Sequence, residues 1–172
     1  VEAFTLYWAF LALFTDKTAK KLLDPSYDRS QRTPFTEDLS RYALERKRSI
    51  PGAIRLLKKQ KQVASDTVFS NVDVLLSPTL AQLPTELGEL SMLQDADTLF
   101  EKLKNFCPFT PYANATGTPS LTVPMGHDDP TNLPIGVLLN GAWGDEATLL
   151  ELALEMEAAQ PFRRIQDQAP PT

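Results

Sequence analysis

The sequence is poor in the residues that most often carry chemistry, because its 172 residues include one cysteine, Cys107, and one histidine, His127. A single cysteine cannot form a disulfide within the chain, which fits a reducing compartment, and we expect a cytoplasmic location. Asp128 and Asp129 could suggest a metal site, but no second cluster of ligands with suitable spacing accompanies them. We therefore predict a turn at this position, no metal, and no other cofactor.

The sequence also lacks a membrane-spanning run and an excess of positive charge. Residues 1–14, VEAFTLYWAFLALF, are mostly apolar, but a spanning helix needs about 20 such residues and a signal peptide needs a basic leader. The net charge is −5, which argues against a nucleic-acid or anionic-membrane surface. Eight of the 17 Lys and Arg residues lie within 41–61, and Tyr42 is the only aromatic residue among them. Without a series of aromatic residues between the charges to stack bases, we expect a solvated helix face. We predict no nucleic-acid and no membrane partner.

Apolar residues at helical spacing predict helices, and short runs rich in leucine and β-branched residues predict strands. A loop is expected from Lys17 to Pro34, and residues 107–112 read as an extended, proline-stiffened connector. The expected helices cover residues 1–14, 36–50, 51–68, 95–106 and 146–159. The expected strands lie near 72–77, 119–125 and 133–140.

These strands are expected to be neighbours in one sheet. The first and third read as buried strands, because both are nearly continuous apolar runs. Asp145 precedes the last helix as a cap, and Leu149, Leu152 and Met156 form an apolar stripe along it. We expect this stripe to pack on the sheet.

Three blocks follow one another in an informative order: DVLLSPTL, PFTPYANATGTPSLTVPMG and LPIGVLLNGAWGDEATLLELA. Together they resemble the carboxy-terminal blocks of the amidase signature family, well over residues 72–162 and loosely over residues 1–71. The resemblance implies an α/β fold class, as the C-terminal part of the amidase-signature fold, with a mixed β-sheet flanked by helices. The positions that carry it are Asn114, Gly117, Pro119, Pro124, Leu133, Pro134, Gly136, Gly141, Gly144, Asp145 and Glu146.

The same resemblance implies hydrolysis of carboxamide C–N bonds through an acyl-enzyme, using a serine, a bridging serine and a lysine. In the family these residues lie upstream of the blocks seen here, and the Gly/Ser-rich signature that carries both serines is absent from this sequence. We therefore assign no catalytic residue and expect the chain alone to be inactive. The expected partners are a small-molecule amide and the missing N-terminal part of the same protein. The expected divisions are a helical segment, 1–71, the strands and helices of the amidase domain, 72–162, and a tail, 163–172.

The resemblance also suggests substrate-binding residues in the connector. In glutamine-hydrolysing, tRNA-dependent members of the family, an aspartate that holds the amino group of glutamine occupies the place of Cys107. A thiol cannot supply that charge, so a neutral or more apolar amide is favoured. Phe109, Thr110 and Tyr112 would lie on the approach to the acyl pocket, and they complete the expected set with Cys107.

Other interpretations stay open at this stage. The chain could be a non-catalytic structural or binding module, or a subunit that pairs with a catalytic chain. It could also be an independent hydrolase if Cys107 and His127 meet in space. Ser77 and Ser120 are weaker candidates, since neither lies in a G-x-S-x-G motif. Self-association is expected if the apolar residues of the first helix, Phe4, Trp8, Leu11 and Phe14, are left uncovered.

Overall fold

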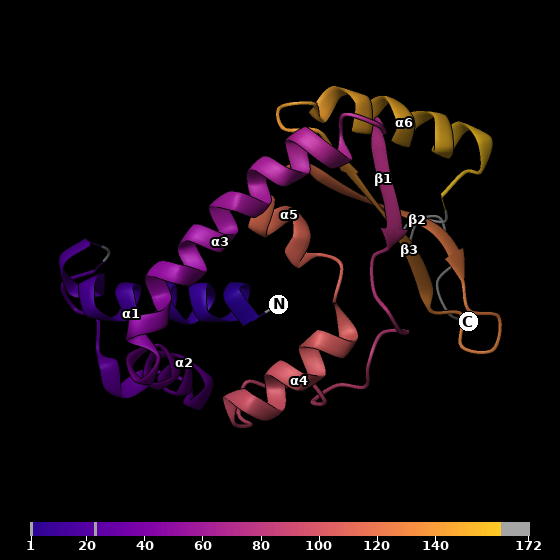
Figure 1. Ribbon diagram of the computed structural model, residues 1–172. Coiled ribbons are helices and arrows are strands. Elements are labelled where there is room, and N and C mark those ends of the chain that lie inside the picture. Colours follow the sequence, from indigo (N-terminus) through magenta and orange to yellow (C-terminus); the bar gives the residue numbers. More distant parts are fainter. Residues whose placement is uncertain (1, 23, 163–172) are drawn as a thin grey trace.

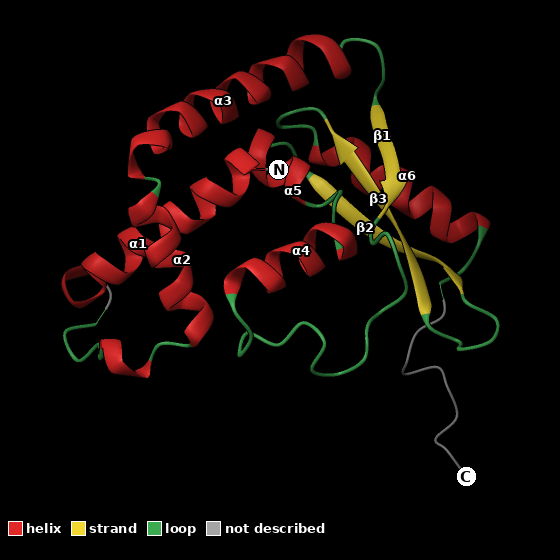
Figure 2. Cartoon of the chain, turned by 60° about the horizontal axis from the view of Figure 1, so that its bottom comes forward, coloured by secondary structure: helices red, strands yellow, loops and turns green. Residues whose placement is uncertain are grey.

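The computed structural model describes residues 2–22 and 24–162, and the predicted tail, 163–172, lies outside the described residues. The helices are α1 Glu2–Leu22, α2 Pro34–Glu45, α3 Ile50–Val63, α4 Ala96–Phe106, α5 Pro111–Thr116 and α6 Glu146–Ala159. The strands are β1 Val74–Pro78, β2 Ser120–His127 and β3 Pro134–Gly141. Helices α1 to α4 gather on one side, and the sheet with α6 forms the other, with α5 between them (Figures 1 and 2).

The three strands form one antiparallel sheet in the order β1-β3-β2. Leu139 of the central strand faces Leu76 of β1 and Leu121 of β2 in the register. The predicted α/β class and the predicted neighbourhood of the strands are both confirmed.

Helix α6 covers one face of the sheet. Val123, Leu139 and Leu149 form the buried centre of this contact, and Leu152 and Met156 pack against them. Strand side chains alternate between the two faces, so Leu121, Val123 and Met125 of β2 all point toward α6. The predicted apolar stripe of this helix is confirmed.

The prediction that β1 is buried is wrong. Leu75 and Leu76 are 37% and 61% exposed, because β1 is an edge strand and α6 makes its contacts with β2 and β3. The prediction for β3 holds over its second half, where Leu138, Leu139 and Asn140 are buried, whereas Ile135 near its start is exposed. An apolar run therefore indicates a strand here but not how completely the strand is covered.

Helix α1 is the centre of the helical part. Its Ala9 and Leu13 are buried against Phe35 of α2 and Leu99 of α4, and α1 also contacts α3. The opposite side of α1 leaves Leu11 and Phe14 exposed. The helix was predicted over 1–14, but it continues to Leu22, so the loop predicted from Lys17 begins later.

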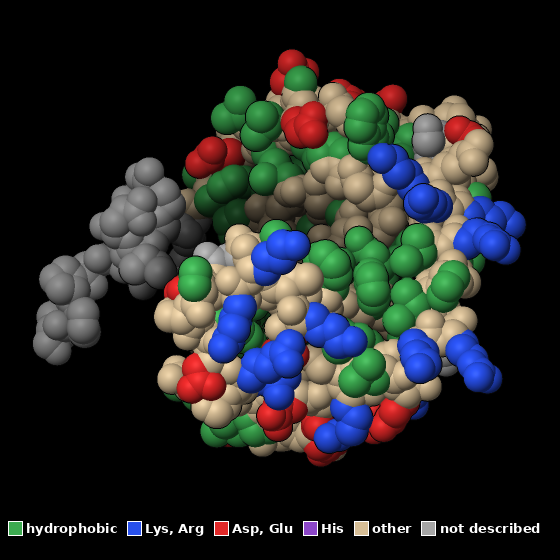
Figure 3. Space-filling model, turned by 90° about the vertical axis from the view of Figure 1, so that its left-hand side faces the viewer, with side chains coloured by type: hydrophobic (Ala, Val, Ile, Leu, Met, Phe, Trp, Pro, Cys, Tyr) green, Lys and Arg blue, Asp and Glu red, His purple; other side chains and the backbone are tan. Residues whose placement is uncertain are grey.

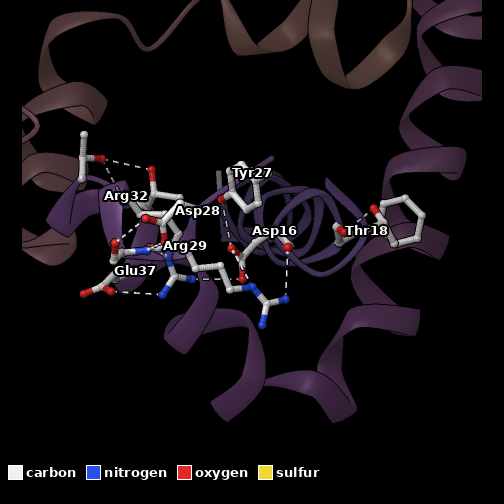
Figure 4. Close-up of polar contacts among 11 residues, drawn as sticks. Asp16, Thr18, Tyr27, Asp28, Arg29, Arg32 and Glu37 are labelled. Carbon is white, nitrogen blue, oxygen red and sulfur yellow. Dashed lines mark hydrogen bonds and ion pairs between the residues drawn. The ribbon is translucent and has the colours of Figure 1, made fainter. Parts of the chain in front are cut away.

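A buried acidic side chain in α1 is bound by the segment that follows the helix. Asp16 is 8% exposed; its carboxylate lies 2.9 Å from a guanidinium nitrogen of Arg32 and accepts a hydrogen bond of 3.1 Å from the Tyr27 hydroxyl. Arg29 lies 3.5 Å away (Figure 4). These contacts compensate for the burial of the carboxylate and hold the segment after α1 against the helix.

The boundaries of α2 and α3 follow from local chemistry. Thr33 caps α2, accepting a hydrogen bond from the Thr36 backbone N–H, and Pro34 occupies its first turn. The helix ends at Glu45 rather than near Ile50, because residues Lys47–Ser49 form a 3₁₀ turn. As predicted, α3 begins with Pro51 in its first turn, and it continues into a π-helical turn, Ala64–Val68.

Candidate functional site

The connector that carries the expected substrate-binding residues becomes helical at its last two residues, Pro111 and Tyr112. We predicted an extended segment over 107–112, but α5 begins at Pro111. Proline fits the first turn of a helix, where its missing N–H has no intrahelical partner to lose. Gly117 ends α5 in the left-handed conformation, with φ of 73°, and its N–H donates to the Ala113 carbonyl at 2.7 Å.

A cavity of about 510 Å³ lies between this connector and the first helix. One wall comes from the end of α4 and the connector, including Cys107 and Thr110. The opposite wall comes from α1 and includes Phe4 and Leu11. The remaining lining residues are Thr5, Tyr7, Trp8, Phe100, Leu103, Lys104, Pro108, Pro111 and Asn114.

Of the four residues expected to bind substrate, the structure brings two onto this cavity. Cys107 and Thr110 line it, whereas Phe109 and Tyr112 are not among the lining residues. The hydroxyl of Tyr112 is buried and has no hydrogen-bond partner within the part of the chain that the structure describes. Burial raises the pKa of Tyr112 above its ordinary value.

The polar groups on the connector wall are already engaged within the protein. The Cys107 thiol donates to the Leu103 carbonyl, with 3.3 Å between sulfur and oxygen. The Thr110 hydroxyl donates to the Cys107 carbonyl at 3.5 Å. The ammonium group of Lys104 forms an ion pair with Glu101 on the same helix. The wall therefore presents mainly apolar surface to the cavity.

Sequence reasoning missed the contribution of α1 to this cavity. Phe4, Trp8 and Leu11 recur at helical spacing, which is the same pattern that a core-facing helix shows. Thr5, a polar residue within the apolar run, is buried and lines the cavity.

The alternative nucleophiles are not arranged for catalysis. The Cys107 thiol donates its hydrogen bond to the Leu103 carbonyl of α4 and not to a base. His127 lies at the end of β2. The Ser77 hydroxyl donates to the Pro78 carbonyl at 3.2 Å. Because these groups are not paired with a base, the described residues show no activated nucleophile.

Asp128 organises a turn between β2 and β3. Its carboxylate accepts from the Thr131 backbone N–H at 3.1 Å and from the Thr131 hydroxyl at 2.5 Å. Across residues 2–22 and 24–162, no group of three or more His, Cys, Asp or Glu side chains is placed to hold a metal ion. None of the described helices combines the length and apolarity needed to cross a membrane.

A second cavity, of about 490 Å³, lies between residues 79–84 and the sheet face opposite α6. Thr122, Pro124 and Gly136 contribute from the strands. Its lining contains no titratable side chain, so it offers no acid or base for catalysis. The cavity beside α1 is therefore the better candidate site, since it joins the expected connector residues to a second wall.

Comparison with known proteins finds a matching family model and similar proteins. The family model described as Amidase matches residues 11–150. "Putative amidase AmiC" of Mycobacterium leprae (strain TN) is 34% identical over 165 residues, which cover 96% of this chain and 35% of that protein. A glutamyl-tRNA(Gln) amidotransferase subunit of Methanosarcina barkeri (strain Fusaro / DSM 804) is 38% identical over 104 residues, covering 60% of this chain and 20% of that protein.

Solved structures show the same fold. A structure of 6-aminohexanoate cyclic dimer hydrolase complexed with substrate aligns with a TM-score of 0.79 and 21% identity, over 96% of this chain and 37% of that chain. Another structure of the same hydrolase aligns with a TM-score of 0.76 over 92% of this chain and 34% of that chain. Nearly the whole length of this chain aligns with these relatives. It spans only about a third of their length. The match of the family model over residues 11–150 confirms the resemblance carried by the three sequence blocks, and the chain belongs to the amidase family.

Proposed function

We propose that this chain is the C-terminal part of an amidase-signature hydrolase that cleaves carboxamide C–N bonds through an acyl-enzyme. The observation that carries the proposal is the family match over residues 11–150, together with the coverage of only 35% of a relative that aligns along 96% of this chain. The serine, bridging serine and lysine would lie in the upstream two thirds. This arrangement accounts for the lack of an activated nucleophile among the described residues.

In the complete protein, this part would supply sheet strands, flanking helices and one side of the substrate pocket. Cys107 and Thr110 would contact the substrate from the cavity wall, with Phe109 and Tyr112 as further members of the set. Residues 1–71 would act as the helical flank and residues 72–162 as the strands and helices of the amidase domain. The single cysteine supports a cytoplasmic location.

The test compares the chain alone with a protein that includes the upstream region. Purified residues 1–172 should release no ammonia from benzamide or hexanamide. The extended protein should turn over such amides and lose activity when the serine of its Gly/Ser-rich segment is replaced by alanine. Turnover by the chain alone that disappears in Cys107→Ser would contradict the proposal and favour a Cys-His hydrolase.

A second candidate function is a non-catalytic partner chain or binding module. It is favoured by the lack of pairing between Cys107 and His127 among the described residues and by the similarity to a protein named as an amidotransferase subunit. The coding sequence immediately upstream distinguishes the two candidates. An in-frame Gly/Ser-rich segment preceded by a lysine supports the hydrolase, and its absence supports the module.

A further inference from the structure

We propose that a basic pocket at the end of α3 binds a phosphate group, either as free phosphate or as part of a small organic molecule. The pocket has a volume of about 330 Å³ and lies where α3 meets the end of α5 and the turn after β3. It shares no lining residue with the cavity beside α1, and the inference goes beyond the proposed function without depending on it. The lining residues are Lys58, Lys61, Gln62, Asp66, Thr116, Thr118 and Trp143.

Two lysines of α3 give the basic pocket its positive charge. Lys58 and Lys61 lie one turn apart on the helix, and both line the pocket. Neither lysine forms an ion pair within the part of the chain that the structure describes. The sequence has no acidic residue between Glu45 and Asp66, so no neighbour on α3 neutralises them. Lysine ammonium groups of this kind bind phosphate as point charges.

The ammonium group of Lys61 is held at the basic pocket from two sides. Its nitrogen lies 4.9 Å from the centre of the Trp143 ring. A β-carbon on Gly117 would lie 3.9 Å from the same nitrogen, so the ammonium group also borders the glycine that ends α5. A cation–π contact does not require a hydrogen-bond acceptor. The N–H donors of Lys61 therefore stay available to the oxygens of an anion.

The end of α5 adds two buried threonine hydroxyls to the basic pocket. Thr116 is buried, and its hydroxyl donates to the Tyr112 carbonyl at 2.9 Å. The Thr118 hydroxyl oxygen is also in a buried residue and lies 2.9 Å from that of Thr116. Because the hydrogen of Thr116 is already engaged, the Thr118 hydroxyl is the one that can turn toward a ligand oxygen.

The chemistry of the basic pocket favours phosphate over a carboxylate. A phosphate monoester carries about −1.5 to −2 charges near pH 7, so each of the two ammonium groups can pair with a separate oxygen, whereas a carboxylate has a single charge. Asp66 lines the same pocket and opposes the binding of any anion. The Trp143 ring is 66% exposed, so it offers an aromatic surface to a planar group attached to the phosphate.

Calorimetric titration at constant ionic strength tests the assignment of a phosphate. Residues 1–172 and the protein extended by the upstream region should each bind inorganic phosphate or adenosine 5′-monophosphate, and adenosine should not bind. Tighter binding of the monophosphate would identify a phosphate carried by an organic molecule, and equal or weaker binding would identify free phosphate. Failure of both to bind, or equal binding of adenosine and its monophosphate, would overturn the inference. Binding to residues 1–172 but not to the extended protein would overturn it for the complete protein.

Three substitutions separate the basic pocket from general effects of charge. Lys58→Gln should weaken phosphate binding by about threefold or more. Lys59→Gln removes the same charge from the next residue, which is exposed and does not line the pocket, and should change the affinity by less than about twofold. Asp66→Asn should strengthen binding, because it removes a repulsive charge. Equal losses in the two lysine variants, with circular dichroism showing that both are folded, would overturn the inference, as would weaker binding in Asp66→Asn.

Discussion

The ammonium group of Lys61, in α3, lies 4.9 Å from the centre of the Trp143 ring, which follows β3. This cation–π contact joins the helical part to the sheet. We expect Trp143→Ala and Lys61→Gln each to lower the free energy of unfolding by about 0.5 to 1 kcal/mol, as exposed contacts of this kind do. Their effects should be less than additive in the double variant, measured by urea denaturation. Lys59→Gln, at an exposed position of α3, is the control and should change little.

The contact between α6 and the sheet offers a matched pair of substitutions. Leu149 is 2% exposed, and the adjacent Leu150 is 57% exposed. Leu149→Ala should lower the free energy of unfolding by about 2 to 5 kcal/mol, because it leaves a cavity in the core. Leu150→Ala should change it by less than about 0.5 kcal/mol. Similar losses for both variants, measured by chemical denaturation, would mean that α6 does not bury the face described above.

Gly136 lies in β3 beside the residue that follows β1, and its carbonyl accepts a hydrogen bond of 3.0 Å from the Thr79 backbone N–H. A β-carbon at this position would lie 2.8 Å from the Thr79 hydroxyl oxygen and 3.0 Å from a methyl carbon of Thr122. Gly136→Ala should therefore destabilise the protein by about 1 to 3 kcal/mol through overpacking. Gly52→Ala is the matched control, since a β-carbon there meets nothing within 4 Å in α3, and it should stabilise the protein by up to about 1 kcal/mol. Thermal unfolding of both variants checks the difference in sign.

Apolar side chains on two surfaces predict self-association of the chain alone. Phe14 is 50% exposed and Leu76 is 61% exposed, and hydrophobic side chains alternate with Lys and Arg over the helical side (Figure 3). Static light scattering should show an apparent mass that rises with concentration. The double variant Phe14→Glu, Leu76→Lys should reduce this rise, and adding the upstream region should abolish it. A constant monomer mass at high concentration would show that these side chains do not drive association.

Elements that depend on neighbouring residues could be predicted from the sequence. Features that depend on contacts between distant segments could not. The strands and the apolar stripe of α6 were predicted because short apolar runs and helical spacing are properties of neighbouring residues. The end of α1 was not predicted, because the burial of Asp16 in this helix depends on its contacts with Tyr27, Arg29 and Arg32, which lie in a separate segment. Helix α5 was missed because six residues are too few to establish a period, and its one proline, Pro111, also suits an extended chain.

The candidate site shows the same limit. The connector residues could be named from the family resemblance, and two of them, Cys107 and Thr110, line the cavity. Its second wall could not be found from the sequence, because Phe4 and Trp8 show the spacing of ordinary core residues. Only the structure, in which α1 lies beside α4, shows that these side chains line a cavity.

The strand order β1-β3-β2 constrains the sequence in which the sheet can assemble. β2 and β3 are consecutive strands that pair across a short turn, whereas β1 and β3 are separated by residues 79–133, which must close into a loop before the two strands can pair. Closing such a loop costs entropy before its contacts form. Within that loop, Leu99 and Phe100 pack with α1 and α2. The β2–β3 hairpin can therefore form early from local contacts, and the docking of β1 is the later step that joins the nascent sheet to the helices.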